Sequence, residues 1–135
     1  MSVNFHFFDL SVGRCDHLPV NQKSKGKFVQ LQHKEDGEYI IFSPLVLCGF
    51  HAQIINLFSS LQDPIWAFEL NSKEDDGELY EDDIEIIGGG YYEVFEDKQR
   101  LNLSGSSQAY GVYNNYGLDE RLKQVEQFKD YSIFC

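Results

Sequence analysis

The chain has 135 residues, of which 42% are hydrophobic and 15% aromatic. This size and composition suit one folded domain with its own core and exclude an intrinsically disordered chain. The formal net charge of −11 argues against nucleic acid and anionic membranes as partners. No apolar run approaches the roughly 20 residues that a membrane-spanning helix needs.

The cysteines and the N-terminus bear on the compartment and on metals. The first residues lack the basic start and the apolar core of a signal peptide. Cys15, Cys48 and Cys135 are therefore expected to be reduced thiols in a cytoplasmic protein. Neither the cysteines nor the histidines follow the spacing of a zinc motif. We expect no metal and no cofactor.

Mixed or alternating apolar residues predict strands in the first third of the chain. These strands are expected over 3–12, 27–33 and 39–43. Residues 13–26 are polar, contain Pro19 and are expected to form a loop. Asp36-Gly37 lies between two strand-like segments, which is a hairpin signal.

A helix is predicted from about residue 49 to about residue 62. Its apolar positions follow the spacing of one buried helical face, namely Phe50, Ile54, Leu57, Phe58 and Leu61. His51 then lies in the first turn, where backbone N–H groups lack helical partners and the dipole favours an anion. A phosphate site is one interpretation, and a structural or solvent-exposed histidine is the other.

The second half of the chain alternates short strands with loops and ends with a helix and a strand. Strands are expected over 65–70, 84–87, 91–95, 100–104 and 131–134, and a helix over 118–128. Residues 71–83 are strongly acidic and are expected to form a solvated loop. Strands with two well-separated helices predict a mixed sheet of the α/β or α+β class.

Local residue types leave two weak candidates for a functional site. Cys48 lacks the arginine that a cysteine phosphatase needs six residues later, because Ile54 is there. Gly88-Gly89-Gly90 is not followed by the Lys-Ser/Thr of a P-loop, so a bulge or a close backbone approach is the alternative. The remaining candidates are His51 and the small-residue loop 105–111.

Three motifs together resemble the Janus/Ocnus family. They are Phe50-His51-Ala52, then Gly88-Gly89-Gly90, then Gly105-Ser106-Ser107-Gln108-Ala109-Tyr110-Gly111, and the segment 128–133 is also similar. The resemblance covers roughly 19–135 of a single domain, with 1–18 as an N-terminal extension and about 62–83 as an acidic insertion. It implies a mixed, roughly six-stranded sheet flanked by two helices.

The characterised activity in this family is that of a protein phosphohistidine phosphatase. The resemblance therefore implies a metal-independent enzyme that hydrolyses the P–N bond of a phosphohistidine-containing protein or a small phosphoramidate, and we expect a monomer. By position, His51 matches the catalytic histidine, as general base or phosphoryl acceptor, and Lys27 matches a strand lysine that stabilises charge. Ala52, Ser107 and Ala109 match the phosphate-binding residues. A labile P–N bond needs mainly positioning and charge stabilisation.

Two departures from the family keep an alternative open. Tyr91 follows the glycines where an arginine is frequent, and the segment 43–48 before His51 lacks basic residues. Fewer cations should weaken the binding of a dianion. The alternative is a non-catalytic phosphate- or phosphoprotein-binding module on the same fold. A structural protein that interacts through its acidic loop is a third hypothesis.

Overall fold

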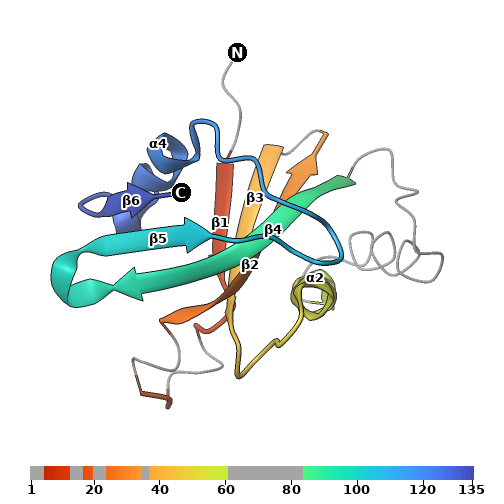
Figure 1. Cartoon of the computed structure of the whole chain (residues 1–135), viewed down its shortest axis with the longest axis horizontal. Helices are drawn as coiled ribbons and strands as arrows, with labels where there is room; N and C mark the ends of the chain where they lie inside the picture. The colour runs from red at the N-terminus through yellow and green to blue at the C-terminus, as the bar shows by residue number, and fades with distance from the viewer. Residues whose placement is uncertain (1–4, 13–16, 20–23, 35–36, 61–83) are drawn as a thin grey trace.

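A mixed six-stranded sheet forms the centre of the molecule (Figure 1). The computed structural model describes residues 5–12, 17–19, 24–34, 37–60 and 84–135. The strands are β1 (Phe5–Asp9), β2 (Lys25–His33), β3 (Gly37–Pro44), β4 (Ile84–Phe95), β5 (Arg100–Ser104) and β6 (Ser132–Phe134). Their spatial order is β1-β3-β2-β4-β5-β6, with parallel pairs at both edges and antiparallel pairs between them. The predicted mixed sheet is confirmed.

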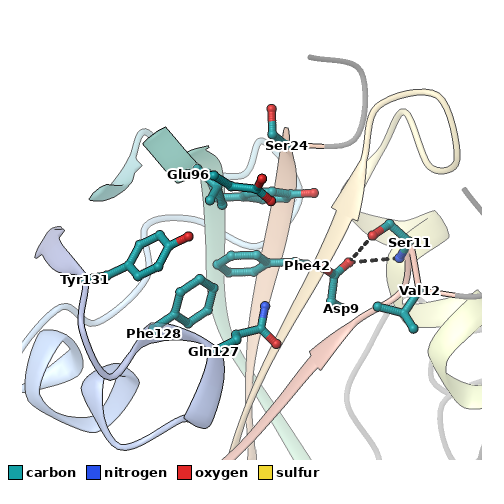
Figure 2. Close-up of a pocket in the computed structure, with 11 residues that line it drawn as sticks. Asp9, Ser11, Val12, Ser24, Phe42, Glu96, Gln127, Phe128 and Tyr131 are labelled. Carbon is teal, nitrogen blue, oxygen red and sulfur yellow. Dashed lines mark hydrogen bonds between the residues drawn. The ribbon is translucent and has the colours of Figure 1, made fainter. Parts of the chain in front are cut away.

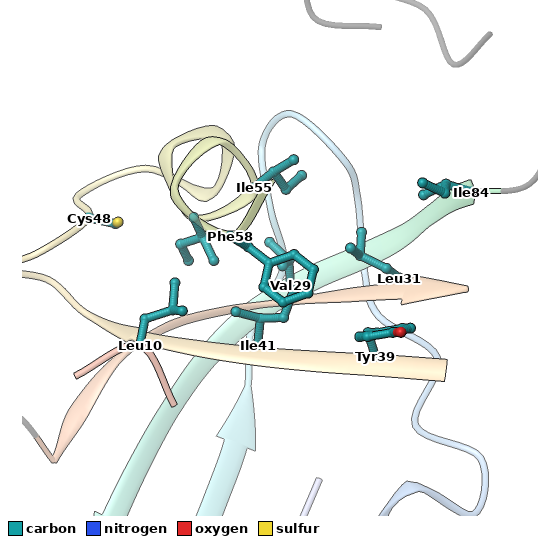
Figure 3. Packing of buried hydrophobic residues seen from close by; sticks show 10 residues of the cluster. Leu10, Val29, Leu31, Tyr39, Ile41, Cys48, Ile55, Phe58 and Ile84 are labelled. Carbon is teal, nitrogen blue, oxygen red and sulfur yellow. The ribbon is translucent and has the colours of Figure 1, made fainter. Parts of the chain in front are cut away.

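Two helices cover opposite faces of this sheet. The helix α2 (His51–Ser60) packs on one face through an α2-side cluster that includes Val29, Ile41 and Phe58 (Figure 3). The helix α4 (Leu118–Lys123) packs on the other face through an α4-side cluster that includes Phe28 and Phe42. Neighbouring strand residues thus alternate between the two clusters, as the pleat requires. Neither helix in the described part of the chain is long and apolar enough to cross a membrane.

The hairpin and the first helix agree with the sequence. β2 and β3 are antiparallel neighbours, and Gly37 at their junction has φ 103°, which favours glycine. Cys48 is buried, as expected for a small apolar residue. Phe50 was expected on the buried helical face, and this expectation is wrong. It precedes the first helical residue, and 69% of its surface is exposed.

Several predicted boundaries differ from the structure. The glycine triplet does not separate two strands, because β4 runs through it without interruption. The second helix ends at Lys123, since Val125 is extended (ψ 132°) before a 3₁₀ turn at Glu126–Phe128. The strand predicted from residue 27 begins at Lys25, and the strands predicted over 3–12 and 131–134 are shorter. The strand predicted over 65–70 and the acidic loop 71–83 lie outside the described residues.

Candidate functional site

The start of α2 is fixed by a side-chain cap. The Oε1 atom of Gln53 accepts hydrogen bonds from the N–H groups of Gly49 (2.9 Å) and Phe50 (3.1 Å). This cap satisfies two of the amides that a helix start leaves without partners. The next amides belong to His51 and Ala52. Within the described ranges, the Ala52 N–H has no hydrogen-bond acceptor.

The His51 ring lies against the glycine triplet of β4. Its Nε2 is 3.0 Å from the carbonyl oxygen of Gly90. A carbonyl only accepts, so Nε2 carries the proton and Nδ1 keeps the lone pair. A Cβ at Gly89 would lie 2.7 Å from His51 Cδ2, so the ring can occupy this place only beside a glycine. Only 5% of His51 is exposed, although it belongs to neither hydrophobic cluster.

Lys27 is the cation beside this histidine. In the β2–β4 pairing, Lys27 lies opposite Tyr91. Its Nζ atom is 5.4 Å from the ring centroid of Phe50 and 5.6 Å from that of Tyr91. The Tyr91 and His51 ring centroids are 6.1 Å apart. Residues from β2, β4 and the start of α2 therefore gather around one cation.

The environment of His51 favours its neutral form. Burial lowers the pKa of His51 below its ordinary value, and the Lys27 ammonium lowers it further, while the hydrogen bond to Gly90 opposes both effects. Desolvation and a nearby like charge both disfavour a protonated imidazole. At neutral pH the ring is therefore uncharged, with Nδ1 available to accept a proton or to attack an electrophile.

The loop 105–111 is joined to the same glycines. Ser107 and Gly111 exchange two backbone hydrogen bonds, and the Gly89 N–H donates to the Gly111 carbonyl at 3.2 Å. Gly89 thus binds the loop through its N–H and lies beside the His51 ring, in the place where a Cβ would clash with it. Figures 1 and 3 both show this loop beside α2, and Tyr110 packs against the α2-side cluster.

The loop presents the predicted phosphate-binding groups in different ways. The Ser107 hydroxyl is buried and accepts a hydrogen bond from the Tyr110 N–H at 3.2 Å, so its own proton remains available for donation. Ala109 is exposed, and among the described residues its N–H has no acceptor. The structure therefore brings the Ser107 loop to His51 through Gly89.

The sequence reasoning missed the part that two aromatic residues play. Tyr91 was noted only as the residue that replaces an arginine, and Phe50 was assigned to the core. In the structure both rings contact Lys27. The alternation along 27–33 indicated a strand that contains Lys27. It did not indicate that Tyr91 lies opposite Lys27, because this depends on the register between strands that are distant in sequence.

A separate pocket of about 260 Å³ lies on the opposite, α4 side of the sheet (Figure 2). It is lined by two carboxylates, Asp9 and Glu96, and by Phe42, Tyr92 and Phe128 of the α4-side cluster, among others. Among the described residues that line it there is no lysine, arginine or histidine. The two carboxylates would repel a phosphoryl group.

Most of the chain matches the model of a known protein family. The model of the Janus/Ocnus family (Ocnus) matches residues 12–132, close to the predicted extent of 19–135. A search of curated proteins gives no match. The described residues contain no group of three or more His, Cys, Asp or Glu that could hold a metal ion.

Proposed function

The chain belongs to the Janus/Ocnus family, and we propose that it is a metal-independent phosphatase that hydrolyses the P–N bond of phosphohistidine. The observation that supports this most is the buried His51 ring bonded to Gly90 near Lys27, with the Ser107 loop joined to the same glycines. The substrate would be a phosphohistidine-containing protein or a small phosphoramidate.

Each residue of the candidate site has its own role in the proposed reaction. Lys27 neutralises the phosphoryl oxygens, while the Ser107 hydroxyl and the Ala52 and Ala109 amides donate hydrogen bonds to them. His51 Nδ1 takes a proton from a water molecule whose oxygen bonds to phosphorus. The P–N bond breaks, the leaving imidazole nitrogen takes a proton, and inorganic phosphate is released. Direct attack by Nδ1, with a phosphorylated His51 as intermediate, is the other route.

The proposed substrate suits this set of residues. A P–N bond is intrinsically labile, so oriented donors and one cation can supply most of what the reaction needs. The hydrogen bond from Nε2 to Gly90 holds the imidazole in the tautomer that either route requires.

A phosphate-binding module without turnover is the second candidate. Two observations favour it. Tyr91 lies where a second cation would help to hold a dianion, and His51 is 5% exposed, which restricts the approach of a nucleophilic water. A module of this kind would keep the donors of the Ser107 loop and bind a phosphoryl group without releasing it.

Phosphate release from phosphoramidate and from a phosphohistidine peptide tests the two candidates. The assay contains a chelator, and the variant is His51→Asn, which stays close in size to the buried ring. The phosphatase proposal expects release by the wild type and none above background by the variant. Release at equal rates would remove His51 from the mechanism. A wild type that binds phosphate but releases none supports the module instead.

A further inference from the structure

Two exposed aromatic rings flank the candidate site, and we propose that Phe50 and Tyr91 form an aromatic subsite for the planar ring that carries the phosphoryl group. Phosphorylated imidazoles would then be preferred to phosphorylated alkylamines such as phospholysine. This inference rests on the proposed function, because it assigns the leaving group of the same reaction.

Packing in the hydrophobic core does not account for the positions of these two rings. Phe50 is 69% exposed and Tyr91 is 44% exposed, while the adjacent His51 is buried. Neither aromatic residue belongs to a hydrophobic cluster. Exposed aromatic side chains beside a candidate site are suited to contact a ligand.

Both rings are oriented by their surroundings. The Lys27 ammonium lies over the face of each ring, at 5.4 Å from Phe50 and 5.6 Å from Tyr91. Tyr91 also packs on Gly105, where a Cβ would lie 2.6 Å from Tyr91 Cδ2. Gly105 has φ 76°, so a glycine serves both the turn and the ring contact. The subsite is therefore preformed, with one ring on β4 and one at the helix start.

The position of Lys27 relates the aromatic subsite to the P–N bond that is broken. A phosphoryl group bound to this ammonium has its leaving nitrogen one bond from phosphorus, and hence close to both rings. The imidazole of phosphohistidine is flat and can stack on an aromatic face or meet its edge. Contacts of this kind give roughly two- to tenfold in affinity. The flexible chain of phospholysine has no planar group to place there.

The rings could instead serve only to hold Lys27. Cation–π contacts to two rings would stabilise the ammonium in either case. If the rings only hold Lys27, removal of a ring should lower kcat/KM by the same factor for every phosphorylated substrate. If the rings bind the leaving group, removal of a ring should lower kcat/KM more for phosphohistidine than for phospholysine.

The test compares a phosphohistidine peptide with a phospholysine peptide that has the same flanking residues. We expect the wild type to give a higher kcat/KM for phosphohistidine, and Phe50→Leu and Tyr91→Leu each to reduce that ratio roughly two- to tenfold. Tyr116→Leu is the matched control, because Tyr116 is 86% exposed next to α4 and should leave the ratio unchanged. Equal kcat/KM values in the wild type, or an unchanged ratio in both variants, overturn the subsite.

A binding measurement separates this inference from the proposed function. Phenylphosphonate and methylphosphonate carry the same anionic group and differ in the ring. The subsite predicts tighter binding of phenylphosphonate by the wild type and a smaller difference in Tyr91→Leu. If the protein hydrolyses no P–N bond, the phosphatase proposal fails and this comparison still decides the subsite. Equal affinities overturn it, whatever the activity.

Discussion

At the scale of single residues, the candidate site depends on a histidine whose protonation is influenced by a neighbouring lysine. The Lys27 ammonium helps to keep His51 neutral, and the Gly90 carbonyl accepts a hydrogen bond from the Nε2–H group. Two aromatic faces in turn stabilise the ammonium. A neutral imidazole beside a cation can act on a phosphoryl group that the cation binds. The charge of Lys27 and the pKa of His51 are thus coupled, and this coupling can be measured.

The first prediction concerns the pH dependence. Because the pKa of His51 is lowered, the base form persists below the ordinary value of about 6.5. The acid limb of kcat/KM should therefore have its midpoint below pH 6.5, with full activity above it. Lys27→Gln removes one cause of the lowering, so the midpoint should move upward. An NMR titration of the His51 ring in both proteins measures this directly, and a midpoint that stays or falls contradicts the coupling.

The second prediction separates Lys27 from general attraction by positive charge. Lys27→Gln should cost about 2–4 kcal/mol of transition-state stabilisation, the scale of one preorganised electrostatic group. Lys25→Gln is the matched control, since it removes the same charge from an exposed position two residues away on β2. Its kcat/KM for phosphoramidate should stay within about a factor of two. Equal losses in the two variants would indicate steering by the surface rather than a defined site.

At the scale of elements, the glycine triplet brings three separate parts of the chain together. A Cβ would meet the Val112 carbonyl at Gly88, His51 at Gly89 and the Ser104 carbonyl at Gly90. Each neighbour is distant in sequence from its glycine. The β2–β4 register also shifts between Gln30 and Leu31, opposite the start of the triplet. The helix α2, the strand β5 and the loop at Val112 thus meet at these glycines, which lack side chains.

This arrangement shows what the sequence could and could not predict. The β2–β3 hairpin and α2 follow from local patterns, Asp36-Gly37 and the spacing of Ile54 and Phe58, and both are confirmed. The alternatives for the glycines, a bulge or a close approach, both occur. The uninterrupted β4 and the contact of Tyr91 with Lys27 depend on partners far along the chain, so local propensity did not indicate them.

The third prediction concerns Gly89. In Gly89→Ala the new methyl group would lie 2.6 Å from the Phe28 carbonyl oxygen and 2.7 Å from the His51 ring, and the backbone atom cannot yield. We expect a loss of about 1–3 kcal/mol in the free energy of unfolding, together with reduced phosphate release. Urea denaturation measures the first effect. Gly49→Ala is the control, because its nearest neighbour would be Gln53 Oε1 at 3.8 Å. Wild-type stability of Gly89→Ala would refute the packing argument.

At the scale of the whole molecule, the segment that runs from the Ser107 loop toward α4 is held at two points. The Gly89 N–H binds it at Gly111, while Gln30 binds it at Asn114 by accepting from its N–H at 2.7 Å and donating to its carbonyl at 3.1 Å. Gln30 also donates to Glu38 at 2.6 Å, and Glu38 forms an ion pair with Arg121 of α4. A buried polar network therefore connects the α4 side of the sheet to the candidate site.

The last prediction follows from this network. Gln30→Leu keeps the approximate size of a buried side chain but removes both bonds to Asn114 and one to Glu38. Buried polar groups without partners should cost about 1–3 kcal/mol of stability. Because the same loop positions Ser107 and Ala109, KM for phosphoramidate should rise more than kcat falls. Hydrogen exchange at the Gly89 amide should also accelerate.

Gln32→Leu provides the comparison on the same strand. Among the described residues, the Gln32 side-chain amide donates only to the adjacent His33 carbonyl, at 3.3 Å, so its removal should leave KM and the exchange rate at Gly89 near their wild-type values. If Gln30→Leu destabilises the fold while KM and the Gly89 exchange rate stay the same, the two attachments of the loop act independently. The candidate site would then depend on Gly89 alone. A change in KM without loss of stability would instead place the effect in the loop rather than in the packing of the sheet.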